Sequence, residues 1–256
     1  MQDYQSFIRQ VNKSIGLDLS LYKEAQMKRR LTSLRNRRGY NSFQQYFEAI
    51  IKDESLMEEF LDKITINVSE FYRNPNRWKV LEKSIFPAFK KKKDNIKIWS
   101  AACSTGEEPY TLSILAQQFW KKENISITAT DIDENVLAHA KQGLYKERAL
   151  QEVTPEVKNK YFHQVADTYK INDDIKKPIV FKKHNLLADS FPQNMDLIVC
   201  RNVLIYFTDE AKEDLYNKFS NALADDGIFF VGSTEQIFNP EKYNLKVHDT
   251  FFYQKM

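Results

Sequence analysis

The second part of the chain, residues 96–256, alternates between short apolar runs and helix-like segments, and this alternation restricts the fold more than any other feature. Residues 107–120, 133–142 and 209–224 read as helices. The apolar runs between them are IKIWSAA, ISITATD, MDLIVCRN and GIFFVG. Strands that alternate with helices predict an α/β fold with a mostly parallel sheet covered on both faces. Near the end, NLKVHDTFFYQ leaves no room for two long helices and predicts a final antiparallel strand.

Residues 1–65 show a different pattern, because their apolar side chains recur at helical spacing. They predict a small all-helical N-terminal domain, in which a new helix begins after Gly39 with Asn41 or Ser42 as its cap. We expect residues 66–95 to link the two parts and to contact the ligand. The helix–strand alternation breaks again at about residues 153–183, where we expect a small strand-rich insertion that leads into a further strand of the sheet.

Composition places only broad limits on function. With 256 residues, 42% of them hydrophobic, the chain can bury the core of one large domain or two small ones. The 38 Lys and Arg nearly balance the 35 Asp and Glu, so a basic partner surface has to come from local clustering. The two cysteines lie far apart in strand-like runs, and no signal peptide or long apolar span is recognisable. We therefore expect a cytoplasmic protein with buried, inert thiols, no direct membrane insertion and no metal site.

The segment SAACSTGEEPY (100–110) follows an apolar run and opens a predicted helix, which is where open parallel sheets bind nucleotides. A pyrophosphate at this place needs several glycines and no adjacent carboxylate. The segment has a single glycine, Gly106, followed by Glu107 and Glu108. These acids repel a pyrophosphate and suit an ammonium or sulfonium group. S-adenosylmethionine contains both groups, so the segment favours this ligand over a dinucleotide.

Polar residues after the later strands complete the predicted site. Asp131 ends the run ISITATD, where a carboxylate accepts hydrogen bonds from ribose hydroxyls, although an Asp here also caps helices. Asn185 and Leu186 follow a predicted strand, as expected for an amide that contacts the adenine edge beside an apolar side chain that covers the ring. Asn202 and Tyr206 follow another strand end, where we expect the reactive end of the ligand.

Five segments occur together in the order that characterises one family. They are INVSEFYRNPNRW, WSAACSTGEEPYTLSILAQQF, TATDIDENVLAHAKQGLY, NLL and CRNVLIYF. Over essentially its whole length, the chain resembles the chemotaxis receptor methyltransferase (CheR) family. The resemblance implies a Rossmann-like S-adenosylmethionine-dependent methyltransferase domain at residues 96–256 after a helical substrate-docking domain. It also implies methylation of glutamate side chains on the cytoplasmic helices of chemoreceptors, with S-adenosyl-L-homocysteine as the second product, for chemotactic adaptation.

The resemblance also implies roles for individual residues. It assigns ligand contacts to Asn67, Ser69 and Arg73 in NVSEFYR, where the family usually has Thr at the position of Ser69. It assigns the methionine part of the cofactor to Glu108, the ribose to Asp131, and the surroundings of the adenosine to Asn185, Leu186, Asn202 and Val203. Arg73 and Tyr206 match residues proposed to act near the transferred methyl group. The structural alternative for Arg73 is an ion pair with an acid.

The segment LYKEAQMKRRLTSLRNRRGY (21–40) combines seven Lys and Arg with Glu24 as its one acid. Such a run is more often a solvated face or a nucleic-acid contact than a protein-docking site. The resemblance implies instead that it meets the acidic methylation helices of the receptor, with a salt-sensitive KM. The docking residues on this interpretation are Lys28, Arg29, Arg35, Arg37 and Arg38. Family members that bind a C-terminal receptor peptide have a glycine-rich turn in the insertion; residues 153–183 contain no glycine, so we expect direct docking without that tether.

Three other functional classes account for part of the sequence. A nucleic-acid methyltransferase explains the basic segment, but its usual Asn/Asp-Pro-Pro-aromatic loop is replaced here by RNVLIY, so we expect no nucleic-acid partner. A non-catalytic cofactor sensor has no need for Arg73, Asn202 and Tyr206 together. A small-molecule methyltransferase leaves the helical domain unexplained.

Overall fold

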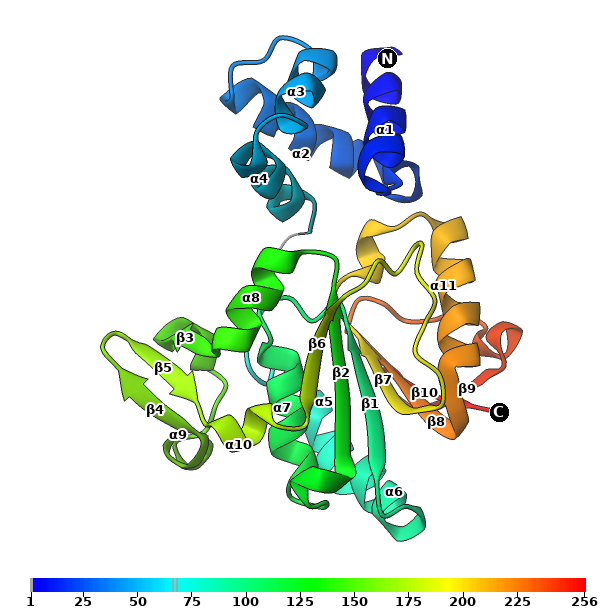
Figure 1. The fold of residues 1–256 in the computed structure, drawn as a ribbon. Coiled ribbons are helices and arrows are strands. Elements are labelled where there is room, and N and C mark those ends of the chain that lie inside the picture. Colours follow the sequence, from blue (N-terminus) through cyan, green and yellow to red (C-terminus); the bar gives the residue numbers. More distant parts are fainter. Residues whose placement is uncertain (1, 66, 68) are drawn as a thin grey trace.

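The computed structural model describes residues 2–65, 67 and 69–256, which form a helical domain followed by a larger domain built on a sheet (Figure 1). The elements of the helical domain are α1 Gln2–Ile15, the 3-10 turn η1 Leu19–Leu21, α2 Glu24–Arg37, α3 Phe43–Ile50 and α4 Glu54–Thr65. Its centre is a cluster of buried rings that includes Phe7, Tyr46 and Phe60. Ser42 caps α3 by accepting a hydrogen bond from the amide of Gln45, which confirms one of the two predicted caps.

Within the described residues, the main sheet has five parallel strands and an antiparallel end. Its strands are β1 Ile96–Ala101, β2 Ile125–Asp131, β6 Ile179–Lys183, β7 Met195–Cys200, β8 Leu223–Val231, β9 Leu245–Asp249 and β10 Phe252–Lys255. In the described part of the chain the spatial order is β6-β2-β1-β7-β8-β10-β9, and β10 is antiparallel to β8 and β9. The chain order reverses between β1 and β7, and ligands bind beside such a reversal in open parallel sheets.

The C-terminal segment differs from the prediction of one final antiparallel strand. It forms two strands, β9 and β10, that pair with each other and place β10 between β8 and β9. The reversal falls at Thr250 and Phe251, and Phe251 takes the left-handed conformation with φ of 70°. The single-strand prediction was wrong because this turn contains neither glycine nor proline, the residues that mark most turns in a sequence.

Helices cover both faces of the main sheet. One face packs against α5 Pro75–Val80, a π-helical turn Leu81–Ile85, α6 Phe86–Lys92 and α7 Glu107–Ala116. The other packs against α11 Asp209–Ala222, and Trp99 and Phe219 belong to the core on that side. The expected linker 66–95 therefore needs correction in its second half. Trp78 and Phe86 are buried against the sheet there, so this half is part of the core rather than a connection.

A small antiparallel sheet stands beside α8 Glu134–Gln142 (Figure 1). Within the described residues its strands are β3 Leu144–Lys146, β4 Phe162–Val165 and β5 Thr168–Ile171 in the order β3-β5-β4, accompanied by α9 Pro155–Tyr161 and α10 Asp173–Lys176. The insertion is strand-rich, but its boundaries differ from the expected 153–183. It begins at β3, a strand too short to show a periodic pattern, and residues 179–183 belong to the main sheet as β6.

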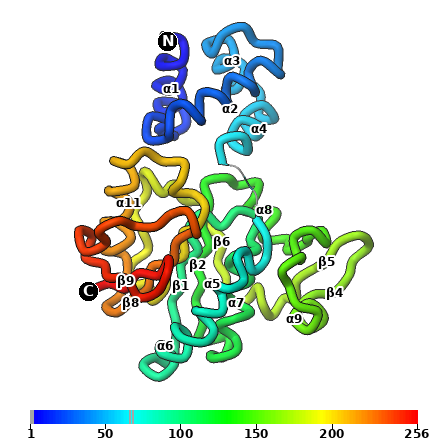
Figure 2. Tube along the Cα trace, turned by 180° about the vertical axis from the view of Figure 1, so that it is seen from behind, coloured from blue at the N-terminus to red at the C-terminus, as the bar shows by residue number. Residues whose placement is uncertain are grey.

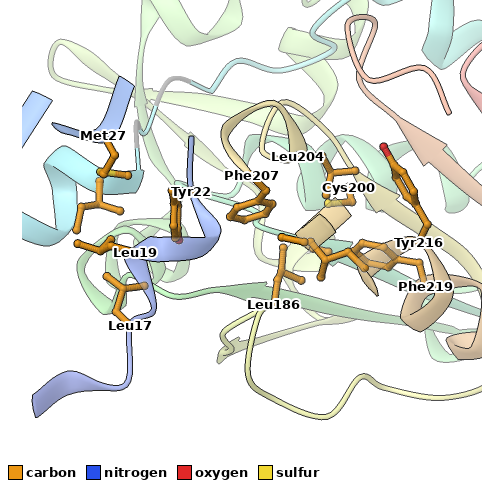
Figure 3. Close-up of a cluster of buried hydrophobic side chains, with 14 of the residues drawn as sticks. Leu17, Leu19, Tyr22, Met27, Leu186, Cys200, Leu204, Phe207, Tyr216 and Phe219 are labelled. Atoms are coloured by element: carbon orange, nitrogen blue, oxygen red, sulfur yellow. The ribbon is translucent and has the colours of Figure 1, made fainter. Parts of the chain in front are cut away.

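The helical domain lies beyond the carboxyl ends of the parallel strands, as the views from both sides show (Figure 1, Figure 2). Tyr22 forms an isolated antiparallel bridge with Phe207, and their rings meet edge to face at 5.0 Å. Figure 3 shows Leu19 and Tyr22 on the side of the helical domain facing Phe207 and Leu186 of the sheet domain. One hydrophobic cluster thus joins the two domains. No helix in the described part of the chain is long and apolar enough to cross a bilayer.

Candidate active site

A pocket lies at the carboxyl ends of β1, β2 and β7, between the sheet domain and the helical domain. It brings together every residue predicted to contact the cofactor or to act in catalysis: Asn67, Ser69, Arg73, Glu108, Asp131, Asn185, Leu186, Asn202, Val203 and Tyr206. Tyr22 and Ile64 of the helical domain also line it. Both domains therefore build the pocket, which the sequence did not indicate.

The loop after β1 forms the floor of this pocket although it contains a single glycine. Ala102, Ser104 and Gly106 all have positive φ values, of 61°, 48° and 95°. A Cβ atom on Gly106 would lie 2.8 Å from Cβ of Ala140, so glycine is required where the loop approaches α8 most closely. The left-handed Ala102 and Ser104 carry backbone strain of the kind that concentrates at binding sites.

Asp131 holds this loop from the end of β2. Its carboxylate accepts hydrogen bonds from the amide of Ser104 at 2.8 Å and from the amide of Asp133 at 3.1 Å. Burial raises the pKa of Asp131 to about 6, against the opposing effect of those backbone hydrogen bonds. The cap of α8 is Asp133, which accepts from the amide of Asn135. Asp131 is thus left to face the pocket.

The two glutamates at the start of α7 have different surroundings. Glu108 lines the pocket, accepts a hydrogen bond from Ser100 Oγ at 2.8 Å, and lies 3.7 Å from Nη1 of Arg201. Burial raises the pKa of Glu108 to about 7, and the nearby Arg201 counteracts only part of that shift. Glu107 is also buried, but its carboxylate accepts from Thr105 Oγ1 at 2.7 Å. A cationic ligand would stabilise the ionised form of Glu108, so this acid fits an ammonium or sulfonium group.

Arg73 lies in a tight turn before α5. The residues on either side of it, Tyr72 and Asn74, both have left-handed backbone conformations, with φ of 54° and 61°. The side chain of Arg73 is one-third exposed, at 33%, and its Nε lies 4.0 Å from Oε1 of Glu70. An acid is therefore near Arg73, as the structural alternative requires, but this contact is at the outer limit of an ion pair and the side chain still lines the pocket.

Tyr206 ends the 3-10 turn η5 Leu204–Tyr206 and meets the helical domain. The guanidinium of Arg30, on α2, lies 4.9 Å from the centre of the Tyr206 ring. The carbonyl oxygen of Tyr206 accepts a hydrogen bond from the amide of Lys23 at 2.9 Å. Helix α2, which we call the basic helix because it carries most of the Lys and Arg of segment 21–40, thus reaches the rim of the pocket through Arg30. Arg30 lies outside the predicted docking set.

The amide side chains at the pocket hold the surrounding loops. Asn67 receives a hydrogen bond from Ser104 Oγ at 3.3 Å and donates to Asp133 Oδ2 at 3.2 Å, so it ties its segment to the loop after β1. Asn185 accepts from the amide of Leu187 and donates to the carbonyl oxygen of Gly16 at 3.4 Å. The predicted adenine contact of Asn185 therefore competes with a contact to the helical domain.

The predicted docking residues do not form one uniform positive face. The side chain of Arg35 is 17% exposed; its guanidinium lies 4.7 Å from the centre of the Phe43 ring and 4.0 Å from Asp3. Arg37 and Arg38 share the carboxylate of Glu59, while Lys28 packs over Tyr4 and Arg29 is exposed. Glu24 is the one acid within the segment 21–40, but α1 and α4 bring two further acids, Asp3 and Glu59, to α2.

Two buried charged residues were missed from the sequence: Arg201, which lines the pocket, and Glu235, which lies behind it. Glu235 accepts hydrogen bonds from the amides of Gly232, Asn202 and Ile205 at 2.8, 2.6 and 3.3 Å, and so holds the loop between β7 and η5. Arg201 lies directly after β7 and contacts Glu108. In both cases the signal was available: a charged residue closely follows an apolar run, LIVC before Arg201 and IFFV before Glu235. Across residues 2–65, 67 and 69–256 no group of His, Cys, Asp and Glu is arranged to hold a metal ion.

Comparison with known proteins gives a consistent identity for both domains. Residues 2–65 match the family domain described as "CheR methyltransferase, all-alpha domain", and residues 67–252 match "CheR methyltransferase, SAM binding domain". The chain is 44% identical to the chemotaxis protein methyltransferase of Listeria innocua serovar 6a, over 99% of this chain and 97% of that protein. It is 34% identical to the protein of the same name from Borreliella burgdorferi, over 90% and 86% of the two chains.

A more distant relative, chemotaxis protein methyltransferase 1 of Pseudomonas aeruginosa, is 31% identical over 95% of this chain and 93% of its own. The matched sequence thus includes the helical domain and the pocket together. The match to the S-adenosylmethionine-binding domain agrees with the acidic, cation-compatible floor of the pocket at Glu108 and Asp131. The chain belongs to the CheR family of S-adenosylmethionine-dependent methyltransferases.

Proposed function

We propose that this methyltransferase acts in the cytoplasm on glutamate side chains of the helical methylation region of chemoreceptors, and that the methyl esters it forms serve chemotactic adaptation. The relatives named above are chemotaxis protein methyltransferases. The observation that carries the proposal is the contact between Arg30 and Tyr206, because it brings a basic helix to the rim of a pocket whose floor is acidic. Such a site accepts a cationic cofactor inside and an anionic acceptor outside.

When bound, S-adenosylmethionine supplies a methyl group activated by its sulfonium. The residues of this chain would hold it by complementary charge and hydrogen bonding. Glu108 faces the pocket as a buried acid and suits the ammonium group of the methionine part. Asp131 suits the ribose hydroxyls, because its position is fixed by the amides of Ser104 and Asp133. Leu186 offers an apolar side chain for the adenine ring.

The acceptor needs orientation more than activation. A glutamate side chain has an unperturbed pKa of about 4.3 and is ionised at neutral pH, so its attack requires no general base. The task of the site is to align a carboxylate oxygen with the methyl carbon and the sulfur. Arg73 can hold the carboxylate through charge-assisted hydrogen bonds and keep it ionised as it leaves water. Tyr206 borders the same space, and the guanidinium of Arg30 packs on its ring.

The helical domain serves as the docking surface for the receptor. Arg29 and Arg30 are the better placed contacts, because Arg29 is exposed and Arg30 reaches the pocket rim. Lys28, Arg37 and Arg38 can add to the positive field around them, although the two arginines share Glu59. Arg35 is packed within the domain. We propose direct docking on this surface, with neither a receptor peptide on the small sheet nor a nucleic acid as partner.

The test is a methyl-transfer assay with labelled S-adenosylmethionine and a cytoplasmic chemoreceptor fragment. After the reaction, mild base is added and volatile label is counted. Label released as methanol supports a carboxyl methyl ester, and replacement of the methylated glutamates by alanine should abolish it. Label that resists base would indicate methylation of nitrogen, and no label despite measurable S-adenosylhomocysteine binding would contradict the chemoreceptor as acceptor.

A further inference from the structure

Arg201 is the buried charge for which the proposed reaction has no assigned use. It follows β7 directly, and its side chain is 3% exposed. The guanidinium packs against two aromatic rings, 5.3 Å from the centre of Trp78 and 4.9 Å from the centre of Phe230. Burial lowers the pKa of Arg201, and Glu108 opposes that shift. Burying a guanidinium is costly, so its contacts should have a purpose that an apolar side chain cannot serve.

Those contacts join two parts of the pocket that are distant in sequence. Nη2 of Arg201 donates to the carbonyl oxygen of Arg73 at 2.8 Å and to Oδ1 of Asn74 at 3.1 Å. Nη1 lies 3.7 Å from Oε2 of Glu108. One rigid planar group therefore spans the turn that carries Arg73 and the acid that faces the cofactor space. The flat fork of an arginine allows this, whereas a lysine offers a single point of charge.

The turn that carries Arg73 needs such support because its backbone is strained. Tyr72 and Asn74 both lie in the left-handed region, which costs free energy for residues with side chains. Such a conformation persists only where its surroundings fix it. The carbonyl of Arg73 is fixed twice, by Arg201 and by Nε1 of Trp78 at 2.9 Å. The same ring of Trp78 also packs on the guanidinium of Arg201.

We infer that Arg201 is a positioning residue, which holds the strained Arg73 turn in register with Glu108 so that the acceptor and the cofactor meet in one geometry. This inference rests on the proposed function, because it takes Arg73 as the group that orients the acceptor carboxylate. Arg201 acts through Arg73 and Glu108 and is not itself the group that binds the acceptor.

The test is a double-mutant cycle between Arg201→Lys and Arg73→Ala, measured with labelled S-adenosylmethionine in single-turnover reactions. Arg201→Lys keeps the positive charge beside Glu108 but cannot make all the contacts of the fork. We expect its turnover at saturating substrate to fall about 10- to 100-fold, the effect of a small misplacement of a catalytic group. We expect its Kd for S-adenosylhomocysteine to stay within about threefold of wild type. In the Arg73→Ala background, Arg201→Lys should cause little further loss.

Two further variants separate positioning from folding. Trp78→Phe keeps a ring against Arg201 but removes one donor to the Arg73 carbonyl, so turnover should fall in the same direction, by a smaller factor, even if Arg201→Lys folds poorly. Lys93→Met is the matched control, because it breaks the partly buried ion pair of Lys93 with Asp196 at the start of β7, away from the pocket. It should lower Tm without changing turnover or the Kd for S-adenosylhomocysteine.

The outcomes distinguish this inference from the proposed function. Equal losses from Arg201→Lys with and without Arg73 would overturn the positioning role and leave the proposed function intact. A large rise in the Kd for S-adenosylhomocysteine at unchanged turnover would make Arg201 a cofactor ligand, which also contradicts the inference. Full turnover in Arg73→Ala alone would remove the proposed role of Arg73 itself.

Discussion

Replacing Gly106 by alanine tests how the loop after β1 builds the cofactor pocket. Two separate costs act at this position. The backbone has a φ of 95°, which a residue with a side chain adopts only under strain. In addition, the new Cβ would lie 2.8 Å from Cβ and 3.2 Å from Cα of Ala140, and 3.1 Å from the hydroxyl of Tyr145. Ala140 belongs to α8, so relief of this contact requires a helix or the loop itself to move.

The magnitude follows from these two costs. A left-handed conformation costs a residue with a side chain roughly 1–2 kcal/mol. Overpacking of a rigid contact adds about 1–3 kcal/mol. We therefore expect Gly106→Ala to lower the free energy of unfolding by roughly 2–5 kcal/mol, the sum of these two costs. The matched control is Gly39→Ala, where φ is also positive, at 78°, and a Cβ would have nothing within 4 Å. It should show the conformational cost alone.

The assay is urea denaturation of both variants, followed by measurement of the Kd for S-adenosylhomocysteine. Gly106 directly precedes Glu107 and α7, so a displaced loop also displaces Glu108 and should weaken binding at least tenfold. Gly39→Ala should bind like wild type. Equal destabilisation of the two variants would refute the argument from the contact with Ala140, and unchanged binding in Gly106→Ala would refute the argument that this contact fixes the pocket.

The other predictions concern the buried acids and the basic helix. Glu235→Gln should cost about 1–3 kcal/mol of stability, measured by denaturation, because it leaves backbone donors of the loop after β7 poorly paired. Kinetic measurements should show a larger loss of turnover than of affinity for S-adenosylhomocysteine. The pKa of Glu108 is raised to about 7, so the affinity for the cationic cofactor should fall as the pH falls through 7. Calorimetry in buffers of different ionisation enthalpy should detect the release of a proton when the cofactor binds. Glu108→Gln should abolish this proton release. For stability the sign is the reverse: the contribution of Glu108 to folding is fully present below its ordinary pKa of 4.5 and is lost as the pH rises through about 7 in the ligand-free protein. Arg30→Ala should raise the KM for the receptor fragment and reduce its salt dependence, whereas Arg35→Ala should mainly lower Tm, since Arg35 packs on Phe43.

The sequence was most informative where one pattern determines both structure and site. The strand ISITATD was predicted at its observed bounds, and its last residue, Asp131, lines the pocket as expected. Strand ends of a parallel sheet meet at one edge, so residues that follow buried runs come together without knowledge of tertiary contacts. For this reason Glu108 and Asn202 also fall in the same pocket.

The sequence was least informative about contacts between segments that have no common pattern. Glu59 and Asp3 reach the basic helix only after four helices pack together in the described domain, so the charge of that helix was overestimated. The helical segment after Arg73 was taken as a linker because its apolar residues follow a strained turn instead of a recognisable strand. The position of Arg201 directly after a strand is visible in the sequence, but its use is not, because the use of a buried arginine depends on the partners that the fold brings to it.

The arrangement of charge around the pocket has a consequence for substrate binding and product release in the proposed reaction. Glu108 and Asp131 lie inside, whereas Arg30 and the partly exposed Arg73 border the side from which an acceptor would approach. A cationic cofactor and an anionic glutamate are thus attracted to different parts of one pocket. Methyl transfer removes both charges, because the sulfonium becomes a neutral thioether and the carboxylate becomes a neutral ester. The methyl ester then loses its attraction to Arg30 and Arg73, whereas S-adenosylhomocysteine loses only the part due to the sulfonium and keeps the ammonium group that suits Glu108. The charges of the site therefore favour release of the methylated acceptor more than release of S-adenosylhomocysteine.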